Sequence, residues 1–244
     1  TNSRCHTDMA AYDFNGGDCT WSDLKFSISN NGVKVEPKSA GACNFGQMNI
    51  PHTPNKFNAL QFHIHTYSEH EIEGTGNGGF FPAELHVVHQ EETEASFAVF
   101  GTMINVGPEP HPQFEGFLQG WEAAAQKVED DCAILTRNIR GLQTGAVQQA
   151  VTCAAPGFGE YLNGTTPTFP SDVVPNVYEL PTNPDFGTFT YKGGLTTPGC
   201  TEIVNWNLLD TPMLISQDQL ARLEKLILCY VGKEFQDDGV TLNR

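Results

Sequence analysis

The sequence predicts a mainly β protein of the α+β class. Strand-like runs of apolar, aromatic and β-branched residues dominate the chain, and two longer segments have the spacing of amphipathic helices. The tripeptide Asn30-Asn31-Gly32 joins two of the strand-like runs and is a strong signal for a hairpin turn. We therefore expect a sheet with a few helices at its periphery.

The expected strands are spread along most of the chain. Each combines β-branched or aromatic residues with alternation or a short apolar run, and turn-forming residues separate neighbouring runs. We predict strands at residues 24–28, 33–35, 57–66, 83–90, 96–106, 187–191 and 203–208.

Two amphipathic helices complete the expected fold. The first, at residues 110–128, carries a stripe that we interpret as core packing and that consists of Phe114, Phe117, Leu118, Trp121 and Ala125. The second begins at the sequence Ser-Gln-Asp-Gln of residues 216–219, which resembles a capping box. Its inward-facing residues are Leu220, Leu223 and Ile227.

The whole chain, residues 1–244, is expected to form one domain. No internal repeat and no linker-like stretch divides it. Residues 129–170 are the hardest to assign, because mixed charge and two cysteines precede a tract rich in Pro, Gly and Thr.

The chain is strongly acidic, with 29 Asp and Glu against 13 Lys and Arg and a formal net charge of −16. Nucleic acids and anionic membranes need a basic partner surface, so neither is an expected partner. No apolar run approaches the length of a membrane span. A small-molecule substrate is expected instead, and the sequence leaves the oligomeric state open.

Seven cysteines lie at positions 5, 19, 43, 132, 153, 200 and 229, without a C-x-x-C pair. This spacing disfavours a zinc ribbon or a thioredoxin-type site and fits disulfides formed in an oxidising compartment. The odd number leaves at least one thiol free or intermolecular, so a disulfide-linked dimer stays open. Together with the glycosylation triplet Asn163-Gly-Thr165, the cysteines favour a secreted glycoprotein or an oxidising organelle lumen.

Three histidines carry the strongest chemical signal. His63 and His65 are two positions apart in an expected strand and therefore face the same side. A neighbouring antiparallel strand can bring His86 beside them. Three neutral imidazoles leave one corner of a zinc tetrahedron open, which is typical of a catalytic zinc site rather than a structural one.

Four segments together resemble the α-class carbonic anhydrases. Gln61-Phe-His-Ile-His65 is similar to the family's Gln-Phe-His-x-His strand, and Ser68-Glu69-His70 to its Ser-Glu-His element. Residues 83–89 are similar to the strand with the third ligand, and residues 191–206 to the block Tyr-x-Gly-Ser-Leu-Thr-Thr-Pro-Pro-Cys-Thr-Glu-x-Val-x-Trp. The resemblance implies one domain on a large twisted, mostly antiparallel central sheet with peripheral helices, and makes residues 129–170 an insertion atypical of the family.

The resemblance also implies the metal site. Zn2+ would be bound by His63, His65 and His86, and Gln61 and Glu84 would hydrogen-bond the ligand imidazoles. The implied activity is zinc-dependent, reversible hydration of CO2 to bicarbonate and a proton, by attack of zinc-bound hydroxide on CO2. Zinc lowers the pKa of a bound water to about 7, an effect for which carbonic anhydrases are the reference case.

Further roles follow from the same resemblance. Thr196 would accept a hydrogen bond from the nucleophile and donate one to Glu69, which together orient the attack on CO2. Thr197 would border the bicarbonate position. The apolar wall that binds CO2 would consist of Val88, Val99, Leu195, Val204 and Trp206.

Departures from the family pattern concern protons and disulfides. His70 and His89 would be structural. Val33 replaces the histidine that usually shuttles protons. Proton transfer would therefore limit turnover unless another group carries the proton, such as His6, His52 or His111. In secreted members, a cysteine after the Thr-Thr-Pro motif pairs with an N-terminal cysteine. The resemblance thus implies a Cys5–Cys200 disulfide, with Cys19 as the fallback partner of Cys200.

Two alternatives compete with this interpretation. In a non-catalytic, carbonic-anhydrase-related binding domain the fold would serve as an interaction module, but such domains usually lose a zinc-binding histidine. In a cupin, Glu69 would join His63 and His65 as a ligand of iron or manganese. The second cupin motif is missing, and residues 191–206 would stay unexplained.

Overall fold

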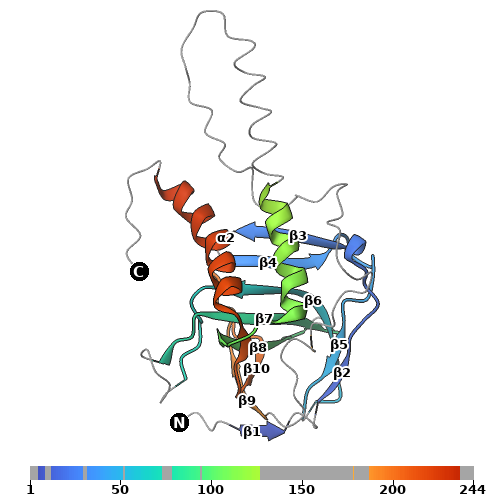
Figure 1. Ribbon diagram of the computed structural model, residues 1–244. Helices are drawn as coiled ribbons and strands as arrows, with labels where there is room; N and C mark the ends of the chain where they lie inside the picture. The colour runs from blue at the N-terminus through green and yellow to red at the C-terminus, as the bar shows by residue number, and fades with distance from the viewer. Residues whose placement is uncertain are drawn as a thin grey trace, which may run out of the picture.

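A computed structural model describes residues 5–8, 12–29, 32–51, 53–72, 79–93, 95–126, 178 and 187–236, with the backbone alone at 5–8, 29 and 228–236. These residues form one large curved sheet with two helices packed across one of its faces (Figure 1). The expected insertion at 129–170 and the glycosylation triplet at Asn163 lie outside the described residues.

The strands are β1 (Cys5–Asp8), β2 (Asp13–Asn15), β3 (Leu24–Ser29), β4 (Gly32–Pro37), β5 (Gln47–Asn49), β6 (Lys56–His65), β7 (Ala83–Glu91), β8 (Phe97–Val106), β9 (Gly187–Gly193), β10 (Val204–Leu209) and β11 (Met213–Ile215). Their order across the sheet is β1-β9-β10-β8-β7-β6-β4-β3; β5 pairs with β6 and β2, and β11 with β8. Only β10 and β11 run parallel to β8, while the other described pairs are antiparallel. The predicted class, a mostly antiparallel central sheet with peripheral helices, is confirmed.

Every strand expected from the sequence is present, within a few residues of its predicted ends. The short strands β1, β2, β5 and β11 were not expected, because three or four residues carry too little periodicity to be recognised. β3 and β4 pair as a hairpin from Ser29 opposite Gly32, as the turn signal predicted.

The helix at residues 112–126 and α2 (Gln217–Gln236) lie across β3, β4, β6 and β7 (Figure 1). Both bury the predicted stripes against the main hydrophobic core, whose sheet-side residues include Phe62, Ile64 and Leu85. Trp121 lies at the centre of this interface, fully buried, and its indole Nε1 donates to the backbone oxygen of Lys34 at 3.0 Å. The helices therefore cover the sheet face that carries the even-numbered residues at the end of β6.

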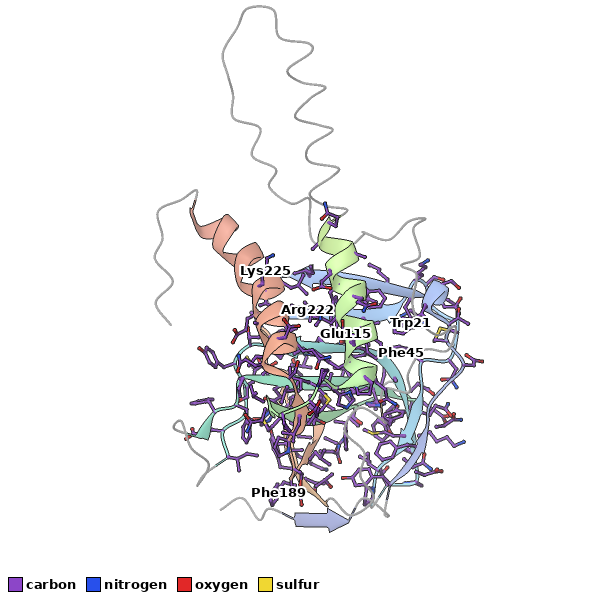
Figure 2. All side chains as sticks on the ribbon, in the orientation of Figure 1. Trp21, Phe45, Glu115, Phe189, Arg222 and Lys225 are labelled. Carbon is purple, nitrogen blue, oxygen red and sulfur yellow. A yellow bond between two sulfur atoms is a disulfide. The ribbon has the colours of Figure 1, made fainter. Side chains whose placement is uncertain are left out.

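Polar contacts fix the two helices relative to each other. Arg222 of α2 makes a two-pronged contact of 2.8 Å with both carboxylate oxygens of Glu122 and donates to Glu115 at 3.0 Å; Figure 2 shows Arg222 and Glu115 between the helices. The predicted capping box is present, because Ser216 Oγ accepts the Gln219 N–H and Gln219 Oε1 accepts the Ser216 N–H, both at 3.2 Å. These contacts orient the helices over the core.

A β-bulge interrupts β6 just before the histidines. Ala59 is opposite His89 and Gln61 is opposite Val88, so Leu60 is an extra residue on β6 and its side chain is exposed. Before the bulge, Ala59 points into the core; after it, Phe62 does. The extra residue thus changes which positions of β6 face the helices, and it leaves the odd-numbered residues from 61 onward on the opposite face.

The disulfide expected from the resemblance is wrong. Cys19 is bonded to Cys43, and Cys200 is a free, exposed thiol. Neither the Cys5 pairing nor the Cys19 fallback for Cys200 therefore forms. Position 43 lies in the turn region between β4 and β5, which folds back to the segment before β3, a proximity that sequence spacing does not reveal.

Candidate metal centre

Strand pairing places two of the predicted ligands in one row across the sheet. Directly paired positions share a face, and β4, β6, β7, β8 and β10 pair as Lys34, His63, His86, Gly101 and Leu208. A Cβ at position 101 would lie 2.6 Å from a methyl of Leu208, so a larger residue in this row would require that side chain to move. The row lies on the sheet face opposite the helices.

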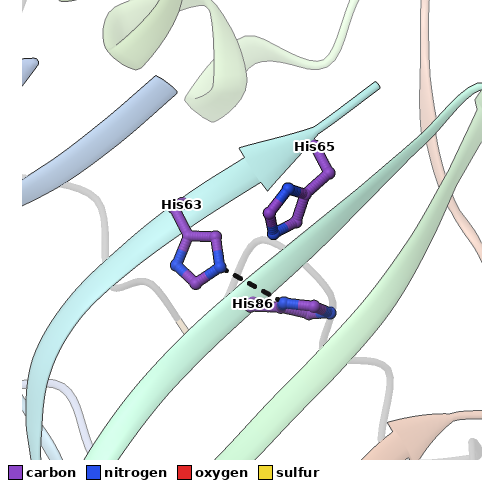
Figure 3. A group of neighbouring side chains, drawn as sticks. All are labelled: His63, His65 and His86. Carbon is purple, nitrogen blue, oxygen red and sulfur yellow. Dashed lines mark hydrogen bonds between the residues drawn. The ribbon is translucent and has the colours of Figure 1, made fainter. Parts of the chain in front are cut away.

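Two of the imidazoles turn lone pairs toward each other. His63 Nδ1 lies 2.9 Å from Gln61 Oε1, and His86 Nε2 lies 2.8 Å from Glu84 Oε1. Both oxygens only accept, so His63 Nδ1 and His86 Nε2 carry the protons. The other two nitrogens, His63 Nε2 and His86 Nδ1, are therefore unprotonated, and they lie 3.3 Å apart. Two lone pairs do not hydrogen-bond, but nitrogens about 2.0–2.1 Å from one tetrahedral Zn2+ are separated by roughly 3.3 Å. The contact dashed in Figure 3 therefore has the geometry of a cation site.

The third imidazole completes the group. The ring centre of His65 lies 4.7 Å from that of His63 and 5.1 Å from that of His86, and one ring nitrogen of each lies within 4.8 Å of the others. Figure 3 shows the three rings converging from β6 and β7. Burial, followed by the neighbouring His86 and His65, holds the pKa of His63 well below its usual value, so the ring is neutral, as a metal ligand must be. The residues present fit Zn2+.

Glu84 supports the ligands from within the sheet. Its carboxylate is fully buried, and Oε1 accepts from His86 Nε2 at 2.8 Å and from His70 Nδ1 at 2.5 Å. Oε2 accepts the backbone N–H groups of Glu69 and His70 at 2.8 and 2.9 Å. Burial alone would raise the pKa of Glu84, but the hydrogen bonds from His70 and His86 outweigh it, so the pKa lies well below its usual range. Glu84 thus remains an anion that fixes the tautomer of His86.

Tyr191 extends this hydrogen-bonded chain. Because His70 Nδ1 donates to Glu84, His70 Nε2 accepts the proton of the Tyr191 hydroxyl, 2.6 Å away. Burial, followed by the nearby carboxylates of Glu84 and Glu69, raises the pKa of Tyr191 to about 12, so the phenol keeps its proton. Tyr191, His70, Glu84 and His86 therefore hold one another in fixed orientations.

A second metal-ligating group is possible on distance alone, formed by His70, Glu84 and His86. Its polar atoms are already paired with one another through the protons of the two imidazoles. We therefore place the metal at the three histidines, where lone pairs converge. The expectation that His70 has a structural role fits its two hydrogen bonds.

An apolar row lies beside the ligand row. Val88, Val99, Trp206 and Tyr191 are paired positions of β7, β8, β10 and β9. They belong to a hydrophobic cluster separate from the main core, which also includes Val204 and Leu195. The structure thus brings together all five residues expected for the apolar wall. The ring of Trp206 lies 5.0 Å from that of His86, so the wall adjoins the metal site.

Glu69 lies beside the histidines, whereas the two threonines of the predicted site belong to an exposed loop. Glu69 Oε2 lies 3.5 Å from His65 Nε2 and 3.8 Å from His86 Nδ1. Thr196 and Thr197 are exposed in the loop after β9, and among the described residues no hydrogen bond joins Thr196 to Glu69. The orienting role of this pair and the bicarbonate contact of Thr197 stay predictions.

Position 33 does not face the site. Val33 is fully buried in the main core and is paired with Ile64, so a side chain here points away from the histidines. The β4 residue on the histidine face is Lys34, which is paired with His63 and whose ammonium lies 2.8 Å from Glu36. The sequence interpretation missed Lys34, although strand alternation combined with pairing to the His-x-His strand would have indicated it.

The other histidines do not reach the metal site where they are described. His89 is paired with Ala59 on the core face, as its spacing from His86 predicted. His111 Nδ1 accepts the backbone N–H of Phe114 at 3.3 Å at the start of the first helix. The side chain of His6 and all of His52 lie outside the described residues, so their suggested shuttle role stays untested.

Comparison with known proteins agrees with this site. The sequence profile of the family described as eukaryotic-type carbonic anhydrase matches residues 2–146 and 167–240. The chain is 29% identical over 178 residues to a carbonic anhydrase of Nostoc sp., covering 72% of this chain and 50% of that protein. It is 27% identical over 186 residues to human carbonic anhydrase 3, covering 71% and 56%. Among solved structures, a carbonic anhydrase of Chlamydomonas reinhardtii in complex with acetazolamide has a TM-score of 0.59 at 19% identity, over 96% of this chain and 78% of that one.

The fold and the converging imidazoles define a protein built on a large sheet, with a histidine group that could hold a metal ion. The profile match shows that the chain belongs to the eukaryotic-type carbonic anhydrase family. It spans about half the length of the curated relatives it matches. Within the described residues, no helix is both long and apolar enough to cross a membrane.

Proposed function

We propose that the protein catalyses the zinc-dependent, reversible hydration of CO2 to bicarbonate and a proton. The observation that carries this proposal is the pair of imidazole lone pairs 3.3 Å apart, His63 Nε2 and His86 Nδ1, with the His65 ring beside them. Gln61 holds His63, and Glu84 holds His86, in the tautomer that leaves the facing nitrogen free to bind a metal. In these tautomers the two facing nitrogens cannot hydrogen-bond each other, so a cation is the partner that suits both.

His63, His65 and His86 would hold the metal. Zn2+ bound to three neutral ligands supplies a Lewis acid that provides a nucleophile from water at neutral pH. Lys34, on the same face as His63, adds a positive charge close to the ligands. Glu69 at the rim of the site is the group that we propose to accept a hydrogen bond from Thr196, which would orient the nucleophile.

The apolar row would receive the substrate. CO2 carries no net charge, so the apolar surface of Val88, Val99 and Trp206 would bind it by excluding water rather than by charge. The product is an anion, which such a wall would not retain, and Thr197 of the exposed loop would contact it. This asymmetry favours entry of CO2 and departure of bicarbonate.

Within the described residues, no side chain is evidently placed to carry the released proton from the site to solvent. Val33 is buried and faces away, so we expect turnover to rise with the concentration of external buffer. Stopped-flow CO2 hydration at increasing buffer concentration tests this. A rate that is already saturated in dilute buffer would show that an internal group carries the proton.

Metal content and activity test the proposed function together. The wild-type protein should retain about one zinc per chain after gel filtration and hydrate CO2, as measured by elemental analysis and stopped-flow. His86→Ala should lose both. His111→Ala is the matched control, because the His111 ring accepts the Phe114 N–H at the start of the first helix and does not belong to the metal-ligating group. Normal zinc content in His86→Ala, or a zinc-loaded wild type without hydration activity, would overturn the proposal.

The same experiment separates the alternatives. A non-catalytic binding domain would hold zinc weakly or show no hydration, whereas all three ligating histidines and their partners are in place here. The cupin alternative is excluded by the family match and by the large sheet with helices on one face.

We infer an oxidising location for the protein. The Cys19–Cys43 disulfide is the supporting observation, because such bonds are rare where thiols are kept reduced. The location would be extracellular or an organelle lumen, with Asn163 as a candidate glycosylation site and the exposed Cys200 as the thiol available for a disulfide-linked dimer. Mass spectrometry of the native protein under non-reducing conditions tests all three inferences.

A further inference from the structure

A second concave site lies away from the histidines. It is a cavity of about 550 Å³ lined by residues of β6, β7, β9 and β10 and by the segment before β6. Lys192, Asn205 and Asn207 line it, and these positions alternate with Tyr191 and Trp206 of the apolar row. They therefore belong to the opposite face of the same two strands, although Tyr191 and Trp206 themselves also contribute to the lining. The volume is in the range of small-molecule sites.

The most unusual group in this cavity is the carboxylate of Glu91 at the end of β7. Its side chain is only 8% exposed. Oε1 accepts from the amide of Asn55 and Oε2 from the hydroxyl of Ser96 at 2.8 Å, and both donors are neutral. In the part of the chain that the structure describes, no Lys, Arg or His forms an ion pair with it within 4.0 Å. Glu91 is thus a nearly buried carboxylate without a cationic partner, an arrangement that is unfavourable unless something else supplies the charge.

The rest of the lining indicates what would supply that charge. Ile50, Phe57 and Ile203 provide apolar walls. The other charged residues of the lining, Lys192 and Glu202, are exposed and opposite in sign, so Glu91 leaves the cavity with a net negative charge. An apolar enclosure with one anionic end is complementary to an apolar molecule with one cationic end.

We propose that this cavity binds a small organic cation, a primary ammonium group on an apolar body, with the ammonium against Glu91. Each oxygen of Glu91 uses one acceptor site for Asn55 or Ser96, and a carboxylate oxygen has a second, so the ammonium can be accepted without breaking either bond. The aromatic or alkyl body would lie against Ile50, Phe57 and Ile203. The zinc-ligating histidines do not line this cavity, although part of its lining is shared with the apolar row.

The test uses 2-phenylethylammonium as the probe and isothermal titration calorimetry on the zinc-loaded full chain. We expect wild-type protein to bind it, and 2-phenylethanol, which has a similar shape but no charge, to bind at least about tenfold more weakly, because hydrogen bonds to charged groups are the stronger ones. Glu91→Gln should weaken the ammonium by about tenfold or more. This variant keeps the hydrogen bonds, since a glutamine oxygen accepts from Asn55 and its amide donates to the Ser96 hydroxyl.

Glu92→Gln is the matched control, since Glu92 is the adjacent, exposed carboxylate and is not part of the lining. It should bind the probe like wild type. Amide chemical shifts provide a second readout that reports the location: binding should move the signals of Ser96 and Asn205 rather than those of His63 and His65. No binding at millimolar concentrations, unchanged affinity in Glu91→Gln, or shifts confined to the histidine site would each overturn the proposal. None of these outcomes bears on zinc content or CO2 hydration.

Discussion

Acid should destabilise the protein through one buried histidine, His89. Its ring is completely buried on the core face, where Nδ1 donates to the backbone oxygen of Ala98 at 3.2 Å. Nε2 is therefore the acceptor, and it receives the proton of the Tyr178 hydroxyl at 2.7 Å, with the two rings stacked. Burial, only partly offset by backbone oxygens, lowers the pKa of His89 from 6.5 to about 4. No carboxylate among the described residues contacts the ring to stabilise its charged form.

The pH dependence of stability follows from the difference between the pKa of His89 in the folded chain and in the unfolded chain. Between pH 6.5 and about 4, the unfolded chain holds a proton on this ring and the folded chain does not, so stability falls as the pH is lowered. The full contribution is present above pH 6.5 and decreases toward the folded-state pKa. Two and a half pKa units correspond to about 3 kcal/mol, of which about 2 kcal/mol is lost by pH 5. That is a large share of a typical domain stability of about 5–15 kcal/mol.

Urea unfolding at a series of pH values measures this dependence. Other groups titrate in the same range, so the informative quantity is the difference between wild type and His89→Gln, in which one donor and one acceptor are kept but no titrating ring is present. The wild-type free energy of unfolding should fall about 2 kcal/mol more than that of the variant between pH 7.5 and 5. The imidazole signal of His89 should not titrate above pH 5. Parallel pH profiles, or a measured pKa near 6.5, would refute the reasoning.

Three other perturbations have clear expected outcomes. Replacing Cys19 and Cys43 by serine should lower the free energy of unfolding by about 3.5 kcal/mol, because the bond closes a loop with a sequence separation of 24. Thermal unfolding that is unchanged within error under matched conditions would contradict this. Gly120→Ala should destabilise by roughly 1–3 kcal/mol in urea, although alanine is the better helix former, since its Cβ would lie 2.3 Å from the ring of Phe26; a gain in stability would show that the ring moves aside. Glu84→Gln should weaken zinc binding by about 10–100-fold in chelator competition, because a neutral amide cannot accept all four of the hydrogen bonds that the carboxylate accepts. Unchanged affinity would mean that His86 is oriented without Glu84.

Much of the fold and site was predictable because it depends on local periodicity. The strand predicted at residues 83–90 and the helical spacing of Phe114, Phe117 and Trp121 are properties of single elements, and the structure confirms both. His63 and His65 had to share a face once they were in one strand. A neighbouring antiparallel strand could bring His86 beside them, the family resemblance implied that it does, and the pairing of β6 with β7 confirms it.

The errors arose where distant segments meet. The expected Cys5–Cys200 bond carried a family pattern onto this chain, but Cys43 is the cysteine that the turn before β5 brings to Cys19. The sequence comparison equated Val33 with the family's proton-shuttling histidine, because both follow a turn. The register of β4 against β6 instead buries Val33 and presents Lys34 beside His63. In each case, the deciding quantity was a distance between segments, which sequence spacing does not contain.

By itself, the sequence determined that this chain makes strands with a histidine pair on one face, two amphipathic helices and a ligand set suited to zinc, because residue type and periodicity are local properties. Only the tertiary structure decided which face that is. The extra residue Leu60 shifts the alternation of β6, so that Phe57 and Ala59 before it and Phe62 and Ile64 after it all enter the same core. Because the strand period is two, one bulged residue turns His63 and His65 away from that core, toward His86 and the apolar row.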